Sequence, residues 1–445
     1  MEHHTSSVDL CDPQSEGSSG VSCETKPGRT LQTLLLCTAW FTPLALALAC
    51  GSDDAGSSES ESSGSSASAS SGTESSGAES SGAETSGAES SGTGESDTDG
   101  GTSGGTTTNC DAAATNLEEV VCAAEAFLGS LSSDERSAAN LAYTDSVART
   151  KWSNLPGKER PGVQIGALSA ESQAKALAMM SAVLSDAGRS DLDGVRAADD
   201  YLASLGGMGG MGGAYGADNY YVAVLGTPSV TEDFVVMFGG HHMAFNMTYV
   251  GGLGYPIPNH LGVEPKAEFT SDGESYAPMA GEGEAMLAVF ASLDSGALAD
   301  AYLAGQTFSD VLIGPLEYGT GSVDAALAKY PTGSNRTGVL VSSLTSDQQA
   351  LVTAAIEEWV DDADPAVADA LMAAYTSAEA YADTYVAWGG TESSGVDPDV
   401  NGTYMRIDGP RLWIEVSCQN GVVVQGKTHY HSIYRDKQFD YGATL

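Results

Sequence analysis

The histidines of this chain are few, and most of them fall into two tight groups. Five of the seven lie beyond the first 109 residues: His241, His242, His260, His429 and His431. His429 and His431 stand two residues apart in THYHSIYRD, where aromatic and β-branched neighbours favour a β-strand. On a strand this spacing puts both imidazoles on one face, about 7 Å apart along the chain. The pair therefore has the geometry of a metal chelate.

His241 and His242 are adjacent in GGHHMAFN, directly after a run of β-branched and aromatic residues. On a regular strand, neighbouring side chains point to opposite faces, so only one of the two can join a site unless Gly239 and Gly240 bend the backbone. Asn246 lies four residues beyond His242 and shares its face in either a strand or a helix. His242 with Asn246 is therefore the better oriented pair, and Asn246 is a candidate catalytic residue.

One histidine of the earlier group and two of the later group would provide three nitrogen ligands. Such a set suits Zn, Cu or Fe and leaves a position open for water or substrate. The candidate ligands of this single transition-metal ion are His241, His242, His429 and His431. Glu264, in NHLGVEP, is a candidate carboxylate ligand or general base. Two alternatives stay open: a metal-free polar cleft, and purely structural histidines.

Several charged residues could serve the same site. Arg435 and Asp436 follow the second histidine group and could orient the imidazoles or bind a substrate carboxylate, with an ordinary ion pair as the alternative. Both are candidate catalytic residues. Arg149 and Arg160 are rare cations in an acidic chain, and each could bind an anionic ligand group or pair with nearby acids.

The remaining motifs favour no other chemistry. The glycine-rich GGMGGMGGAYG after Leu205 lacks the GK[ST] ending of a phosphate loop, so we expect a mobile loop and no nucleotide cofactor. The GxSxG match at Gly101 and the SxxK match at Ser172 lack the contexts that make such motifs catalytic. The chain is strongly acidic, with 60 acidic and 18 basic residues and a net charge of −42, so it repels phosphate backbones. Nucleic acid is therefore disfavoured as a partner.

The elements that would position these residues are helices in the first part of the domain and strands in the last. Helices are expected at 116–131, 168–185, 191–205, 344–360 and 365–385. Strands are expected at 220–225, 234–238, 404–407, 411–416, 421–425 and 427–434, with a hairpin around Gln419, Asn420 and Gly421. We therefore expect an α+β fold in which a helical N-terminal part packs on an antiparallel β-rich part, as a single large domain over residues 110–445.

The first 109 residues have the character of a targeting segment followed by a tether. Lys26 and Arg29 precede an apolar run that ends in LALALAC at Cys50, which is the order of an export signal. Residues 1–50 resemble a bacterial lipoprotein signal, whose cysteine is lipidated after cleavage; the alternative is an uncleaved membrane span. Residues 51–109, rich in Ser, Gly and Glu, are expected to be a disordered linker. The domain would then be exported and anchored to the cell envelope through a lipid at Cys50.

The cysteines of the domain fit such a location. Cys110 and Cys122 are close enough in sequence to close a short loop in an oxidising compartment, although the sequence leaves open whether they do. Cys418 lies in a strand-like segment next to a turn. A buried, inert thiol is therefore expected there rather than a nucleophile.

Several stretches of the chain carry specific patterns. They are RTKWSNLP, RPGVQIGALSAESQAKALAMMSAVLSDAG, YYVAVLGTPSVTEDFVVMFGGHHMAFNMTYVGG, LGVEP and GKTHYHSIYRDKQFDYG. Together they resemble a bacterial and fungal family, the domain of unknown function DUF3500, over nearly all of residues 130–445. The resemblance implies a shared domain without a known reaction. The polar motif positions of the family correspond to His241, His242, Asn246, Glu264, His429, His431, Arg435 and Asp436.

The chain departs from that family at one strand. Phe234, Val235 and Val236 stand where the family has a Trp-rich segment, which argues against an aromatic substrate wall there. The function expected overall is that of an extracytoplasmic lipoprotein with a metal-dependent, His-ligated hydrolase or oxidoreductase site. The rival is a non-catalytic surface module that uses the same His, Asn and Arg cleft to bind a small molecule or a component of the cell envelope.

Overall fold

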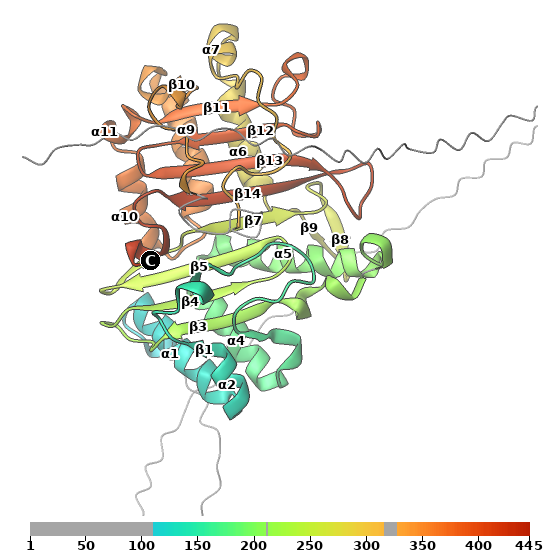
Figure 1. Ribbon diagram of the computed structural model, residues 1–445, viewed down its shortest axis with the longest axis vertical. Helices are drawn as coiled ribbons and strands as arrows, with labels where there is room; N and C mark the ends of the chain where they lie inside the picture. The colour runs from blue at the N-terminus through green and yellow to red at the C-terminus, as the bar shows by residue number, and fades with distance from the viewer. Residues whose placement is uncertain (1–109, 211, 316–326) are drawn as a thin grey trace, which may run out of the picture. The chain divides into compact units, whose positions relative to one another are not determined.

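The computed structural model describes residues 110–210, 212–315 and 327–445. The expected export signal, the linker and Cys50 lie outside these residues. The described chain builds a 12-stranded sheet, a separate two-stranded sheet and a set of helices (Figure 1). In this part of the chain, no helix combines the length and the apolar character needed to cross a membrane.

The large sheet runs in the order β1-β3-β4-β5-β7-β14-β13-β12-β11-β10, with β2 paired to β3 and β6 paired to β5. The strand bounds are β1 Asn140–Leu141, β2 Val163–Gln164, β3 Tyr221–Gly226, β4 Phe234–Gly239, β5 Met243–Val250, β6 Leu253–Tyr255, β7 Asn259–Val263, β8 Phe269–Ser271, β9 Glu274–Tyr276, β10 Val339–Leu340, β11 Tyr385–Gly389, β12 Tyr404–Asp408, β13 Leu412–Asn420 and β14 Thr428–Asp436. β1 pairs with β3 in parallel, and the long central strands pair antiparallel.

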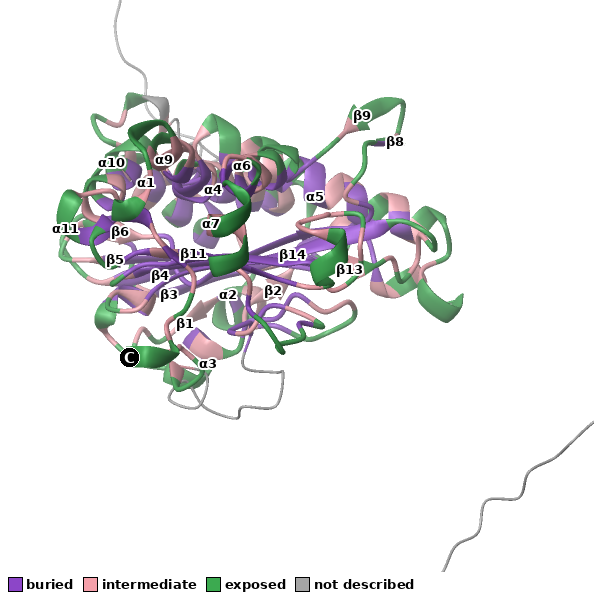
Figure 2. Cartoon of the chain, turned by 90° about the horizontal axis from the view of Figure 1, so that it is seen from above, coloured by how far each residue is buried: buried purple, intermediate pink, exposed green. Residues whose placement is uncertain are grey.

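Most of the long helices cover one face of this sheet. Their bounds are α1 Asn116–Ser130, α2 Ser133–Ala139, α3 Ser146–Thr150, α4 Ala170–Ala182, α5 Asp186–Ser204, α6 Ala280–Ala291, α7 Ser295–Asp300, α9 Ser346–Val360, α10 Pro365–Tyr375 and α11 Ala378–Tyr381. Figure 2 shows α1, α4, α5, α6, α9 and α10 on one side of the sheet and α3 on the other. The expected α+β architecture, with helices preceding the strands, is confirmed.

Side-chain alternation along β14 decides which residues meet the helices. Tyr430 and Tyr434 belong to the main core between sheet and helices, and Trp359 of α9 donates a hydrogen bond to Ser432. Ile433 belongs instead to a smaller cluster on the opposite face, with Trp152 and Trp413 among its members. The odd-numbered residues of β14, including both histidines, therefore point away from the helical layer.

Two expected elements differ from the structure. The strand expected at 421–425 is part of the turn that joins β13 and β14, because β13 stays paired with β14 as far as Asn420 and Thr428. The turn is then closed by the Gly421 N–H, which donates to the Lys427 carbonyl. The helix expected at 365–385 ends at Tyr375; Ser377 caps the short α11, and β11 begins at Tyr385.

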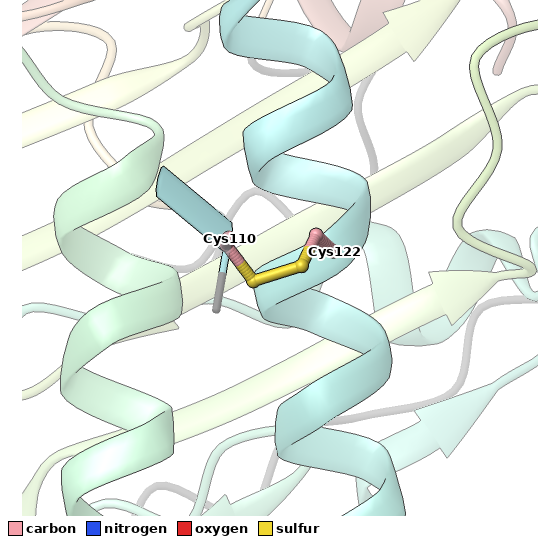
Figure 3. The surroundings of a disulfide bond; sticks show 2 residues. All are labelled: Cys110 and Cys122. Atoms are coloured by element: carbon pink, nitrogen blue, oxygen red, sulfur yellow. A yellow bond between two sulfur atoms is a disulfide. The ribbon is translucent and has the colours of Figure 1, made fainter. Parts of the chain in front are cut away.

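The start of the domain is crosslinked. Cys110 and Cys122 form a disulfide with their Cα atoms 5.7 Å apart, which ties the turn before α1 to that helix (Figure 3). Cys418 is buried and free, and burial raises the pKa of its thiol to about 12. The thiol is therefore protonated at neutral pH, as expected for an inert cysteine.

Candidate metal centre

His241 and His242 lie in the tight turn that joins β4 to β5. The turn is closed by the Gly240 N–H, which donates to the Met243 carbonyl. His242 adopts a left-handed conformation with φ 65°, and the two imidazoles stack with their ring centroids 3.7 Å apart. On a regular strand, the side chains of His241 and His242 would point to opposite faces. Because the pair occupies a turn, the backbone bends at His242 and brings both rings to one side.

The segment before β2 holds this turn in place. The His242 N–H donates to the Asn154 carbonyl (3.0 Å), and Arg160 donates to the Gly240 carbonyl (2.7 Å). Arg160 also donates to the carbonyls of Ser153 and Leu155. A Cβ on Gly240 would lie 2.4 Å from the Tyr220 ring, so glycine permits the close packing. Arg160 therefore serves the backbone of the turn.

His429 and His431 meet His242 across the end of the sheet. The ring centroids of His429 and His431 lie 5.0 Å apart, and those of His242 lie 5.7 Å and 5.3 Å from them. One ring nitrogen from each of the three residues lies within 4.8 Å of the other two. The expected common face of His429 and His431 is confirmed. The three imidazoles form a buried cluster that could bind a metal ion.

Burial keeps the imidazoles of His242 and His429 neutral. Burial and then the surrounding histidines lower the pKa of His242 well below its usual range. The same causes lower the pKa of His429 to about 3. A neutral imidazole offers a lone pair, which is the form that binds a metal ion.

The two histidines of β14 differ in their hydrogen bonds. Nδ1 of His431 lies 2.9 Å from Oδ1 of Asp310 and 3.0 Å from the amide nitrogen of Gln419. In a neutral ring, donation from Nδ1 to the carboxylate would leave the lone pair of Nε2 free for a ligand. Nδ1 of His429 is buried and has no hydrogen-bond partner in the described part of the chain. A buried polar atom left without a partner costs about 1–3 kcal/mol, and a bound ion or ligand atom at this nitrogen would offset that cost.

His241 is placed beside the cluster rather than in it. Its Nδ1 lies 2.7 Å from Oδ1 of the buried Asp199, and its ring meets Tyr215 edge to face. It also lines a cavity of about 210 Å³, whose lining residues include Lys158, Gln164, Asn219 and Tyr221. His241 thus connects the three-histidine cluster to a small polar space.

His260 is a part of the site that sequence reasoning left without a role. Its Nδ1 donates to the His242 carbonyl (3.2 Å), so its Nε2 accepts from the Asn154 amide (2.9 Å). Burial lowers the pKa of His260 to about 3, which keeps the ring neutral. Both nitrogens are engaged, so His260 supports the His242 backbone instead of offering a ligand atom. No spacing signal in NHLGVEP could have shown this, because both partners are distant in sequence.

Gly262 makes room for the imidazoles. It pairs with His431 in the ladder between β7 and β14. A Cβ at this position would lie 3.1 Å from Cδ2 of His431, 3.3 Å from Cδ2 of His242 and 2.8 Å from the Tyr430 carbonyl oxygen. Any side chain here would enter the space that the two rings occupy.

Two other predicted residues contact the backbone rather than an imidazole. Oε1 of Glu264 accepts the N–H groups of Val423 (2.6 Å) and Val424 (2.7 Å), and so holds the turn between β13 and β14. The Asn246 amide donates to the Pro258 carbonyl (2.7 Å), and its Oδ1 has no partner in the part of the chain that the structure describes. The Glu264 carboxylate does not belong to the set of close ligand atoms.

Arg435 and Asp436 lie farther along β14. Arg435 points to the histidine face, donates to the Ile313 carbonyl (2.9 Å) and pairs with Asp440 (2.6 Å). Asp436 accepts from the Tyr375 hydroxyl (2.9 Å) and pairs with Arg411. The side chains of Arg435 and Asp436 are therefore both engaged in ion pairs and hydrogen bonds within the fold.

Arg149 is also engaged in contacts within the fold. Arg149 donates to the carbonyls of Tyr441 (2.7 Å) and Thr444 (2.8 Å), so it stabilises the C-terminal turn.

Six residues around the cluster were not predicted from the sequence: Asn154, Asp199, His260, Gly262, Asp310 and Gln419.

The fold and the site together define an α+β protein with a buried three-histidine cluster at the end of a mixed sheet. Residues 113–443 match the family described as "Protein of unknown function (DUF3500)", and the chain belongs to this family. The comparison with curated proteins found no match. Nor does any solved structure match the chain.

Proposed function

We propose that this protein binds one transition-metal ion through His242, His429 and His431 and uses it in hydrolytic or oxidative chemistry on a small polar molecule. The observation that carries the proposal is the cluster itself. Three buried imidazoles, from a turn and a strand far apart in sequence, each place a nitrogen within 4.8 Å of the others.

The donor set fits a metal of the Zn, Cu or Fe group. Three neutral imidazole nitrogens are common ligands of these ions and leave at least one position for water or substrate. When bound there, the ion would polarise a substrate or lower the pKa of a bound water. The chain's own residues orient the ligands: Asp310 contacts Nδ1 of His431, and His260 contacts the His242 carbonyl.

A purely structural role fits the observations less well. Structural histidines in a protein interior have their ring nitrogens paired, as His260 has. His429 instead keeps a buried nitrogen without a partner in the described chain. The cavity of about 210 Å³ beside His241 offers a space for a small substrate. A non-catalytic binding module would use that same space, and metal content separates the two functions.

The proposed location is the cell envelope, with the domain exported and held by a lipid at Cys50. Its support is the order of Lys26, Arg29, the apolar run and LALALAC in the sequence. The Cys110–Cys122 disulfide adds to it, since such bonds persist in oxidising compartments.

The test is elemental analysis of the full chain, expressed for export without a histidine tag and purified in detergent. We expect about one equivalent of Zn, Cu or Fe in the wild type and none in the His429→Ala, His431→Ala double variant. Tyr430→Phe is the matched control, because this residue lies between the two histidines but faces the helical core. Circular dichroism shows whether each variant is folded.

Two outcomes would count against the proposal. A wild type that stays free of metal, even after reconstitution with each ion, would remove the metal centre and leave the metal-free binding module as the working model. A double variant that retains the metal would show that the ion binds elsewhere in the chain.

A further inference from the structure

Two fully buried charged residues, Glu415 on β13 and Arg435 on β14, hold the same short segment, residues 310–314. Glu415 is 0 % exposed and Arg435 is 1 % exposed. Burying a charge is costly unless it is paired or well hydrogen-bonded. The partners of these two charges therefore show what they do for the fold.

Glu415 binds the N–H groups of the segment. Its Oε2 accepts from the Leu312 N–H (2.5 Å) and its Oε1 from the Ile313 N–H (3.0 Å). The same two oxygens accept from the Trp413 indole (2.6 Å) and the Tyr404 hydroxyl (2.8 Å). Four donors thus surround the carboxylate, and two of them tie it to the segment.

Arg435 binds the carbonyl groups of the segment. Its Nε donates to the Ile313 carbonyl (2.9 Å), and its Nη2 donates to the Gly314 carbonyl (3.3 Å). Its Nη1 pairs with Asp440 (2.6 Å), which balances the charge. An acid and a base on neighbouring strands therefore fix both the donors and the acceptors of one stretch of backbone.

The residue at the head of this segment is Asp310. Its Oδ1 accepts from the Val311 N–H (2.7 Å) and lies 2.9 Å from Nδ1 of His431. The position of Asp310 beside the imidazole therefore depends on the backbone that Glu415 and Arg435 hold.

We propose that Glu415 and Arg435 are positioning residues that set the metal affinity of the three-histidine centre through Asp310. This inference rests on the proposed metal centre. A carboxylate on the outer nitrogen of a ligating imidazole fixes the ring and raises its basicity, and loss of such a partner weakens metal binding about 10- to 100-fold. Neither residue touches a ligand, so the effect passes through residues 310–314.

The test measures the dissociation constant for Zn²⁺, by competition with a chromophoric chelator, in the full chain. The variants are Asp310→Asn, Glu415→Gln and the two combined. We expect Asp310→Asn to weaken Zn²⁺ binding about 10- to 100-fold and Glu415→Gln to weaken it about tenfold. A glutamine amide cannot accept at both ends, so one N–H of the segment loses its partner.

The combined variant shows whether Glu415 acts by positioning Asp310 or by disturbing the fold in general. If Glu415 acts through Asp310, Glu415→Gln adds no further weakening once Asp310 is Asn. Asp408→Asn is the matched control: Asp408 is also 0 % exposed, but its partners are Arg336 and Lys437. It should leave the Zn²⁺ affinity unchanged in a folded protein.

If Glu415→Gln does not fold, Arg435→Lys tests the same segment from its carbonyl side and should also weaken Zn²⁺ binding. The inference is overturned if Glu415→Gln and Arg435→Lys both fold and bind Zn²⁺ with wild-type affinity. It is also overturned if Glu415→Gln weakens Zn²⁺ binding by the same factor in the wild type and in the Asp310→Asn variant. A wild type that binds neither Zn²⁺ nor, in parallel titrations, Cu²⁺ or Fe²⁺ would overturn the proposed function as well, and the wild-type titrations alone show that case.

Discussion

The imidazoles of His241 and His242 lie stacked, with 3.7 Å between ring centroids, although the residues are neighbours in the chain. The left-handed φ of His242, 65°, makes this possible. A residue other than glycine rarely adopts this conformation and pays about 1–2 kcal/mol for it. The turn thus accepts a strained backbone to present His242 to the histidines of β14, as strained residues at functional sites often do.

The strain at His242 gives a first prediction. His242→Gly and His242→Ala both remove the imidazole, so both should abolish metal binding. Glycine adopts φ 65° without penalty, so His242→Gly should be more stable than His242→Ala by about 1 kcal/mol. Urea denaturation of the two metal-free variants measures the difference. Equal stabilities would show that the left-handed turn carries no strain.

The space above Gly262 gives a second prediction. The Cβ of Gly262→Ala would lie 2.8 Å from the Tyr430 carbonyl oxygen and 3.1 Å from Cδ2 of His431. We expect this variant to lose at least about 1 kcal/mol of stability from overpacking and to bind metal more weakly. Gly129→Ala is the control, because its Cβ would meet nothing within 4 Å in α1. The control should be neutral or slightly stabilising, with unchanged metal content.

A group of buried acids gives a third prediction, on pH. Burial and then Asp191 raise the pKa of both Glu282 and Asp362 well above the usual range. A group whose pKa is raised on folding stabilises the fold fully below its unfolded pKa, and this contribution is lost as the pH rises through the folded pKa. Thermal unfolding should therefore show Glu282→Gln to be more stable than wild type at pH 8, with the difference vanishing near pH 4.

The control for this pH effect is Glu284→Gln, an exposed acid on the same helix. It should follow the wild-type profile at every pH. A Glu282→Gln profile parallel to the wild type between pH 4 and pH 8 would show that Glu282 titrates normally in the folded protein.

The disulfide gives a fourth prediction. Cys110 and Cys122 are separated by 12 residues, and closing a loop of this size stabilises a fold by up to about 3 kcal/mol. Replacing both cysteines with serine should lower the free energy of unfolding by up to this amount and leave metal content unchanged. Chemical denaturation and elemental analysis of the same sample check both parts. Loss of the metal would mean that the Cys110–Cys122 disulfide affects the structure of the three-histidine cluster.

The sequence predicted those parts of the site that depend on local geometry. The spacing of two between His429 and His431 requires only that the segment be a strand, and it is one. Strand alternation leaves the turn at His242 only as an alternative, a bend at Gly239 and Gly240, because nothing in the sequence shows that β4 ends at Gly239. Helix 186–204 was expected to begin five residues later, because its N-cap, Ser185, was assigned to the preceding helix.

Other parts of the site depend on contacts between distant residues. Asp310 reaches His431 across 121 residues, and Asn154 reaches His260 across 106. Periodicity along a chain reports on which face a residue lies, not on which strand will pair beside it. The pairing of β7 with β14, which brings Gly262 under His431, has no local sequence signal.

The strand order also determines when the three-histidine cluster can form. β14 is the last strand of the chain, yet it lies in the middle of the large sheet, between β7 and β13. The first half of the site, the His242 turn, is synthesised about 190 residues before His429 and His431. A chain emerging in order from a ribosome therefore cannot assemble the three-histidine cluster until β14 has emerged, and any metal uptake would have to follow the pairing of β14 with β7 and β13.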